Sequence, residues 1–400
     1  MRSALQGARD PQIVRIVASV DAMMRRGPAD LLIEPLRRRL ARLRPPRPLR
    51  FGRLLFHPLD LLVVPTARWR PGQPVIPRTA LTPLAEHVRM TMGAAGAAIE
   101  KELAGRTTDD GELISELGRS LWPGAGAILA DTAAPRTWTT TRLGHRNYRR
   151  LAGVVASLLA EAAIVDTLRA EAATGLLQPD PEVINGILRR MSRADDAALP
   201  MMIALLLDGV SDAAALLPSR PTRHEASAMQ ASIAEASDLL LWHLDREEGA
   251  ETRVAAGTLA DASAAVKRIA ALLQQLDAVN VDPKRRDRLR AVRQRLDADC
   301  KARFVSGLQD ELLSPLQHVG VPPEPARIPA IESAARGLRR LAVEGRAVGS
   351  GATYRLLLDK AATVIKSAAM RDRLAAVDQL RLVEILIGSD AALALLEQQR

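Results

Sequence analysis

The sequence predicts an all-α protein, an irregular multi-helix bundle or solenoid, and its composition and apolar spacing are the basis of that prediction. Apolar residues make up 48% of the 400 positions, whereas only nine residues are aromatic, so Leu, Ala, Val and Ile must fill the core. Leu, Ala and Arg recur in almost every part of the chain and are strong helix formers. Apolar residues also recur three and four positions apart, which is the spacing of a helix face. We therefore expect thin helix–helix interfaces and no deep aromatic pocket.

The N-terminal part of the chain divides into two predicted modules. The first, residues 1–44, carries two predicted basic helices separated at Gly27-Pro28. The second, residues 45–83, contains nine prolines, a density that disfavours long helices and central strands. Because this stretch also contains three of the nine aromatic residues, we expect an extended arm that docks on the helical body.

Residues 84–220 are predicted to form a helical module. Its strongest helix signal is the apolar stripe between Leu151 and Val165. Asp180 followed by Pro181 has the pattern of an N-cap with proline at the first helical position, which predicts a short helix ending near residue 193.

The next module, residues 221–318, contains the clearest predicted element, a long antiparallel helical hairpin. A capping box at Thr222 and Glu225 predicts the helix that precedes it. The first arm of the hairpin has a heptad seam, and Asp282 with Pro283 is expected to begin the second arm. The seam residues of the two arms are Leu259, Ala262, Val266, Ile269, Leu273 and Leu276, followed by Leu289, Val292, Leu296, Cys300, Phe304, Leu308 and Leu312.

A proline-rich break separates this hairpin from a C-terminal module, residues 324–400. Apolar residues between Ile331 and Leu341 predict one helix there, and one or two further helices are expected after Gly351. No fixed repeat of 33–47 residues holds along the chain, so the sequence favours an irregular helical array over a named repeat architecture.

The sequence contains none of the motifs that usually indicate catalysis or cofactor binding. It has no phosphate-binding glycine loop with lysine, no His-Glu-x-x-His and no G-x-S-x-G. Its six histidines are scattered, so we expect no metal site and no cofactor. Cys300, the only cysteine, falls on the hairpin seam and is predicted to be a buried packing residue. A non-enzymatic role is expected, with a helical enzyme that lacks a local motif as the alternative.

The expected location is the cytoplasm. No segment has the roughly 20 uninterrupted apolar residues of a membrane helix, so no transmembrane segment is predicted. Arg9 and Asp10 interrupt the start of the chain, which is unlike a secretory signal. A single cysteine also suits a reducing compartment.

The net charge of +10 is concentrated near the N-terminus, where residues 1–53 carry thirteen arginines and four acidic residues. A second basic cluster follows the cap at Asp282, where cations oppose the helix dipole. We therefore consider two polyanion-binding candidates, each with a solvated helix face as the alternative. The candidate residues are Arg37, Arg38, Arg39, Arg42, Arg44, Arg47, Arg50 and Arg53, together with Lys284, Arg285, Arg286, Arg288 and Arg290.

A third basic segment, residues 137–150, mixes Trp138, His145 and Tyr148 with four arginines. Its composition resembles that of a loop that contacts nucleic acid. The alternative is a helix entry whose aromatic residues are anchored in the core.

Three functions follow from these patterns. The first is a non-enzymatic interaction or scaffold protein that binds a protein partner through the hairpin and the C-terminal helices. The second is a nucleic-acid-binding protein that uses the arginine-rich N-terminus on the phosphate backbone. The third is peripheral association with an anionic membrane through residues 29–44, which have an apolar stripe beside an arginine-rich face. The sequence does not indicate an oligomeric state.

Overall fold

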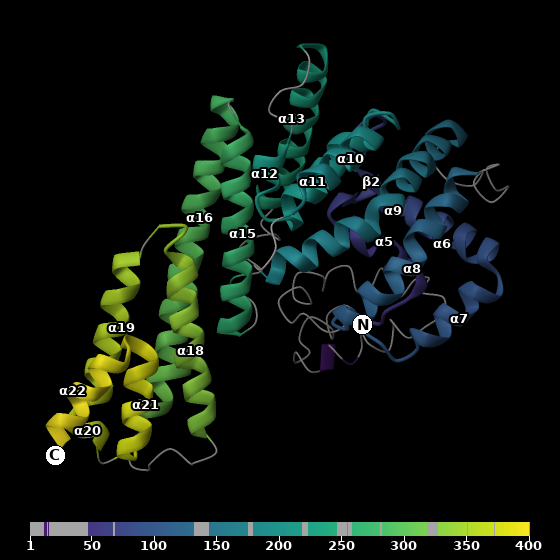
Figure 1. The fold of residues 1–400 in the computed structure, drawn as a ribbon. Helices are drawn as coiled ribbons and strands as arrows, with labels where there is room; N and C mark the ends of the chain where they lie inside the picture. Colours follow the sequence, from purple (N-terminus) through teal and green to yellow (C-terminus); the bar gives the residue numbers. More distant parts are fainter. Residues whose placement is uncertain are drawn as a thin grey trace, which may run out of the picture.

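The computed structural model confirms the all-α class (Figure 1). It describes residues 12–13, 15, 47–66, 69–131, 144–174, 179–217, 223–245, 254, 258–280, 282–317, 327–349, 351–371 and 373–399. Within these ranges the only strands are β1 (Val63–Val64) and β2 (Ile76–Pro77), which pair in parallel. Figure 1 shows an N-terminal body, the helices α15 and α16 beside it, and the C-terminal helices on the far side of that pair.

Two long helices, α8 (Gly111–Ala130) and α9 (His145–Thr174), form the centre of the N-terminal body. They pack so closely that a Cβ atom at Gly126 would lie 2.9 Å from the Ala156 carbonyl oxygen. Among the described residues, α9 is the one helix long and apolar enough to cross a membrane, and 61% of its apolar window is buried in the fold. Packing against α8 therefore accounts for much of its apolar character.

Within the segment expected as an extended arm, residues 51–62 and 78–83 are helical, which corrects the expectation for those residues, whereas the described residues between them contain β1 and β2 and no α-helix. Residues Phe51–Phe56 form α5 and His57–Leu62 form a 3-10 helix, η2. Pro58 lies in the first turn of η2, where its missing N–H leaves no helical bond unmade. The buried Trp122 indole donates a hydrogen bond to the Leu54 carbonyl over 3.0 Å, so α5 belongs to the core.

Two helices, α6 (Arg78–Met92) and α7 (Ala94–Glu102), complete this side of the body. The high proline density did not exclude helices here, because several prolines lie at helix starts and turns and Pro83 is accommodated inside α6.

Four helices connect the body to the hairpin: α10 (Pro181–Met191), α11 (Ala198–Gly209), α12 (Ala213–Leu216) and α13 (Arg223–Asp245). The predicted cap of α10 is confirmed, because the Asp180 carboxylate accepts a hydrogen bond from the Glu182 backbone N–H over 2.9 Å. The predicted capping box before α13 includes Thr222, which lies outside the described residues.

The hairpin consists of α15 (Leu259–Val279) and α16 (Pro283–Gly307), with its predicted seam residues buried. The two helices run antiparallel: a Cβ atom at Gly307 would lie 2.6 Å from Leu259 Cδ2, and Arg293 pairs with Asp277 near the turn. The Asp282 carboxylate accepts a hydrogen bond from the Lys284 backbone N–H, as predicted. Beyond α16, a π-helical turn (Leu308–Leu313) and α17 (Ser314–Gln317) continue the second arm.

The C-terminal module contains α18 (Ile328–Gly345), α19 (Gly351–Lys366), α20 (Ala368–Arg371), α21 (Ala376–Ile387) and α22 (Ser389–Gln399). It therefore has more helices after Gly351 than the one or two expected. Helix α18 packs on α15 at Gly337, where a Cβ atom would lie 2.6 Å from the Leu259 Cβ. Buried Glu332 pairs with Arg336 and with Arg381, which joins α18 to α21.

Candidate functional site

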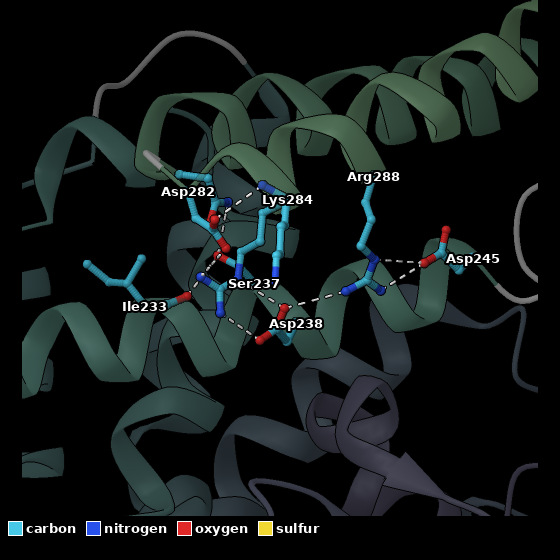
Figure 2. A network of polar contacts seen from close by, with 9 residues as sticks. Ile233, Ser237, Asp238, Asp245, Asp282, Lys284 and Arg288 are labelled. Atoms are coloured by element: carbon cyan, nitrogen blue, oxygen red, sulfur yellow. Dashed lines mark hydrogen bonds and ion pairs between the residues drawn. The ribbon is translucent and has the colours of Figure 1, made fainter.

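The basic cluster at the start of α16 faces carboxylates of α13 (Figure 2). The Arg285 guanidinium donates two hydrogen bonds to Asp238, over 2.8 and 3.0 Å, and the Arg285 side chain is only 22% exposed. Arg288 reaches Asp245 over 2.8 Å and Asp238 over 3.5 Å. Asp245 also pairs with Arg295 over 2.7 Å. These cations are therefore engaged by counterions from the same chain.

The other predicted residues of this cluster have local partners or face solvent. Arg286 donates to the Asn280 carbonyl over 3.0 Å, and Arg290 pairs with Asp287 inside α16. Lys284 is exposed. A neutral contact lies beside the ion pairs, since the buried Asn280 amide donates to Ser237 Oγ over 3.1 Å.

Sequence reasoning missed the role of the two α13 carboxylates. Asp238 and Asp245 are seven residues apart, so they lie on one face of α13 two turns apart. Their spacing was a usable signal, because Arg288 and Arg295 on α16 have the same separation. Only the packing of the two helices shows that these faces meet.

The N-terminal candidate residues are only partly described. Arg37, Arg38, Arg39, Arg42 and Arg44 lie outside the described residues. Arg47, Arg50 and Arg53 lie at and just before α5, where Arg53 donates a hydrogen bond to the Pro48 carbonyl. The Arg47 carbonyl accepts one from the Thr108 backbone N–H over 2.9 Å, which fixes this stretch against the body.

A central cleft of about 1160 Å³ lies between the N-terminal body and the hairpin. Several of its polar groups hold the two parts together. Arg268 of α15 donates to both carboxylate oxygens of Asp208, over 2.9 and 3.1 Å. The Gln275 amide donates to the carbonyls of Leu207 and Val210 at the C-terminal end of α11, where backbone acceptors have no partner within the helix.

The other side of this cleft carries Arg169 from α9 and Asp60 from η2. Arg169 donates to the Leu205 carbonyl over 3.0 Å, and burial lowers the pKa of its guanidinium. Burial raises the pKa of Asp60, although the nearby His57 and arginine charges oppose that shift. Cations and carboxylates both line the cleft. Arg268 pairs with Asp208 of α11 and Arg169 donates to α11, so we interpret the cleft as the joint between the two parts of the chain.

A second cleft, of about 670 Å³, lies along the first turns of α9. It is lined by Arg146, Arg149 and Arg150, with Asp195 on the opposite side. Of the third basic segment, residues 137–143 lie outside the described ranges. Tyr148 is fully buried and its hydroxyl donates a hydrogen bond to the Ala80 carbonyl over 3.3 Å, which agrees with the alternative that the aromatic residues anchor this segment in the core. The three arginines, in contrast, face the cleft.

The predicted inertness of Cys300 agrees with its position. Its side chain is fully buried on the hairpin seam, and burial raises the pKa of the thiol. Among the described residues, no group of three or more His, Cys, Asp or Glu side chains is arranged to hold a metal ion.

Comparison of the chain with protein-family models, with curated proteins and with solved structures finds no match. The functional argument therefore depends on the chemistry of these surfaces alone.

Proposed function

We propose that this protein is a helical interaction protein that binds a protein partner through its C-terminal helices. The observation that carries the proposal is the distribution of exposed apolar side chains. Of the eight large exposed apolar side chains in the described part of the chain, six lie between residues 305 and 396, so this exposure belongs mainly to the C-terminal half. Contiguous exposed apolar surface is typical of protein–protein contact sites.

Helix α22 offers the most regular such surface. Leu393 is 58% exposed and Leu396 is 37% exposed, and residues three apart lie side by side on a helix. Leu395 is buried against the rest of the module. Leucine therefore lies on the outward side as well as the inward side of α22, whereas an ordinary surface helix has polar residues outward. Val377 on α21, the helix packed on α22, is 72% exposed.

The N-terminal body and the joint suit a scaffold role. Partly exposed Arg–Asp pairs, including Arg268–Asp208 and Arg288–Asp245, join the hairpin to the connecting helices α11 and α13, and the C-terminal helices lie on the hairpin's far side (Figure 1). In this arrangement the α22 surface is held away from the body and is accessible to a partner.

The test is a pair of charge-matched variants. Leu393→Glu/Leu396→Glu introduces two acidic residues on the outer face of α22, and Ala94→Glu/Ala97→Glu introduces the same charges at exposed positions of α7. Each protein is used to capture partners from its native cells in the presence of nuclease, and the captured protein is then purified for direct titration. We expect the wild type and the α7 variant to bind it equally, and the α22 variant to bind at least about tenfold more weakly because charge disrupts an apolar contact. Equal binding by all three proteins would exclude α22 as the contact surface.

A further inference from the structure

The arginine-lined cleft at the start of α9 has a simple construction. Arg146, Arg149, Arg150 and Gly153 follow one another at helical spacing, so they lie along one face of α9. The α10–α11 connection, which includes Asp195, lies opposite. Gly153 contributes no side chain, and a Cβ atom there would meet nothing within 4 Å, so the floor of the cleft is open.

The charges in this cleft are not balanced within the described residues. Arg150 is held by both oxygens of Asp195, over 2.8 Å each, and these hydrogen bonds lower the pKa of the Asp195 carboxyl despite its partial burial. Arg146 and Arg149 are exposed, and no ion pair or hydrogen bond joins either guanidinium to another described residue. Three arginines and Asp195 line the cleft, and Asp196 also lies close enough to act on Arg150, so arginines outnumber carboxylates by three to two and the excess positive charge lies at Arg146 and Arg149.

A comparison of α9 with α16 shows why this imbalance is informative. Both helices begin with clustered arginines and have no acidic residue in the first turn. Such clusters are locally unfavourable, because neighbouring like charges repel and cations oppose the dipole at a helix N-terminus. In α16 the cost is offset by Asp238 and Asp245 of α13, whereas in α9 only Arg150 has such a counterion.

We propose that this cleft binds a phosphate group, with Arg146 and Arg149 as its ligating side chains. Planar guanidinium groups match phosphate geometry and form bidentate, charge-assisted hydrogen bonds. The Asp195 pair holds Arg150 in place, and buried Tyr148 anchors the first turn of α9 on the opposite side of the helix. A volume of about 670 Å³ admits a phosphate ester of nucleotide size. The same chemistry would serve a small phosphate ester or a phosphodiester of a nucleic-acid backbone.

The experiment measures binding by isothermal titration calorimetry at 50 mM NaCl with three probes: pyrophosphate, a nucleoside diphosphate and a single-stranded oligonucleotide. The test variant is Arg146→Ala/Arg149→Ala. The control variant, Arg340→Ala/Arg355→Ala, removes the same charge from exposed positions of α18 and α19. Thermal unfolding of both variants establishes that the exposed substitutions leave the fold intact.

We expect at least one probe to bind the wild type and the control equally. The test variant should bind it at least about tenfold more weakly, since two charge-assisted contacts are lost. Raising the salt to 200 mM should weaken wild-type binding severalfold. The probe that binds identifies the carrier of the phosphate group. Absence of binding by every probe, or equal weakening in the test and control variants, would overturn the proposal.

Discussion

The ion pairs between α13 and α16 allow a specific prediction for the substitution Asp245→Asn. The Asp245 carboxylate accepts from Arg288 over 2.8 Å and from Arg295 over 2.7 Å. The substitution keeps the size of the side chain and removes its charge, so Arg295 loses its ionic partner and Arg288 keeps only its longer contact with Asp238, while packing is preserved.

The expected magnitude follows from exposure. The Asp245 side chain is 34% exposed, and those of Arg288 and Arg295 are 42% and 47% exposed. Water screens pairs of this kind, so each contributes about 0.5 kcal/mol. The loss of both Asp245 pairs should therefore destabilise the packing of α13 on α16 by about 1 kcal/mol. Opening of α13 should then become roughly fivefold more frequent. Hydrogen–deuterium exchange of peptides from α13 and α16 measures this opening directly.

Salt and pH provide independent checks. At 1 M NaCl the Debye length is about 3 Å, so most of the difference between wild type and Asp245→Asn should disappear. Burial raises the pKa of Asp245, but the hydrogen bonds from Arg288 and Arg295 outweigh it, and the net pKa is below the ordinary value of 3.8. A lowered carboxyl pKa stabilises the fold at neutral pH, and this contribution is lost as the pH falls below 3.8 through the native pKa.

The control for this prediction is Asp287→Asn, which breaks a pair with Arg290 inside α16 that is about 70% exposed on both sides. It should leave exchange of α13 unchanged, because it joins no second helix. A double-mutant cycle between Asp245→Asn and Arg288→Met should give a coupling of about 0.5 kcal/mol at low salt. Zero coupling at 50 mM NaCl, or a coupling unchanged at 1 M NaCl, would show that ion pairing does not hold α13 against α16.

Two further substitutions and one labelling experiment test the packing. Leu273→Asp places a charge on the fully buried hairpin seam and should cost about 4 kcal/mol or more in urea unfolding, whereas Gln274→Asp at the adjacent exposed position should cost little; equal midpoints would contradict the seam. Gly126→Leu must displace the backbone of α9 near Ala156, so a loss of about 2 kcal/mol or more is expected, and an unchanged melting temperature would show that α8 and α9 are not in close contact. Cys300 should react with a thiol reagent only as fast as the hairpin opens, because its thiol is buried; rapid labelling of the native protein would be inconsistent with that position.

Local sequence patterns predicted much of the helical architecture. The caps at Asp180 and Asp282, and the seam from Leu259 to Leu276, lie where the sequence placed them. These signals are short-range, since a cap acts within three residues and a helix face repeats every three or four. The stretch around Pro58 was predicted wrongly because a high proline count was taken to disfavour helices wherever the prolines lie. A proline in the first turn of a helix removes no helical hydrogen bond, and Pro58 lies in the first turn of η2.

The sequence by itself therefore determined the helices and the composition of their apolar faces, whereas the tertiary structure decided which charges are balanced. Arg285 and Arg146 belong to similar arginine clusters at helix starts, and no local pattern distinguishes them. Asp238, the partner of Arg285, is 47 residues away along the chain, and only the packing of α13 on α16 brings the two side chains within 2.8 Å. Because ionic interactions depend on distance in space while helix periodicity depends on distance along the chain, the sequence could name the candidate arginines but could not separate structural cations from those available to a ligand.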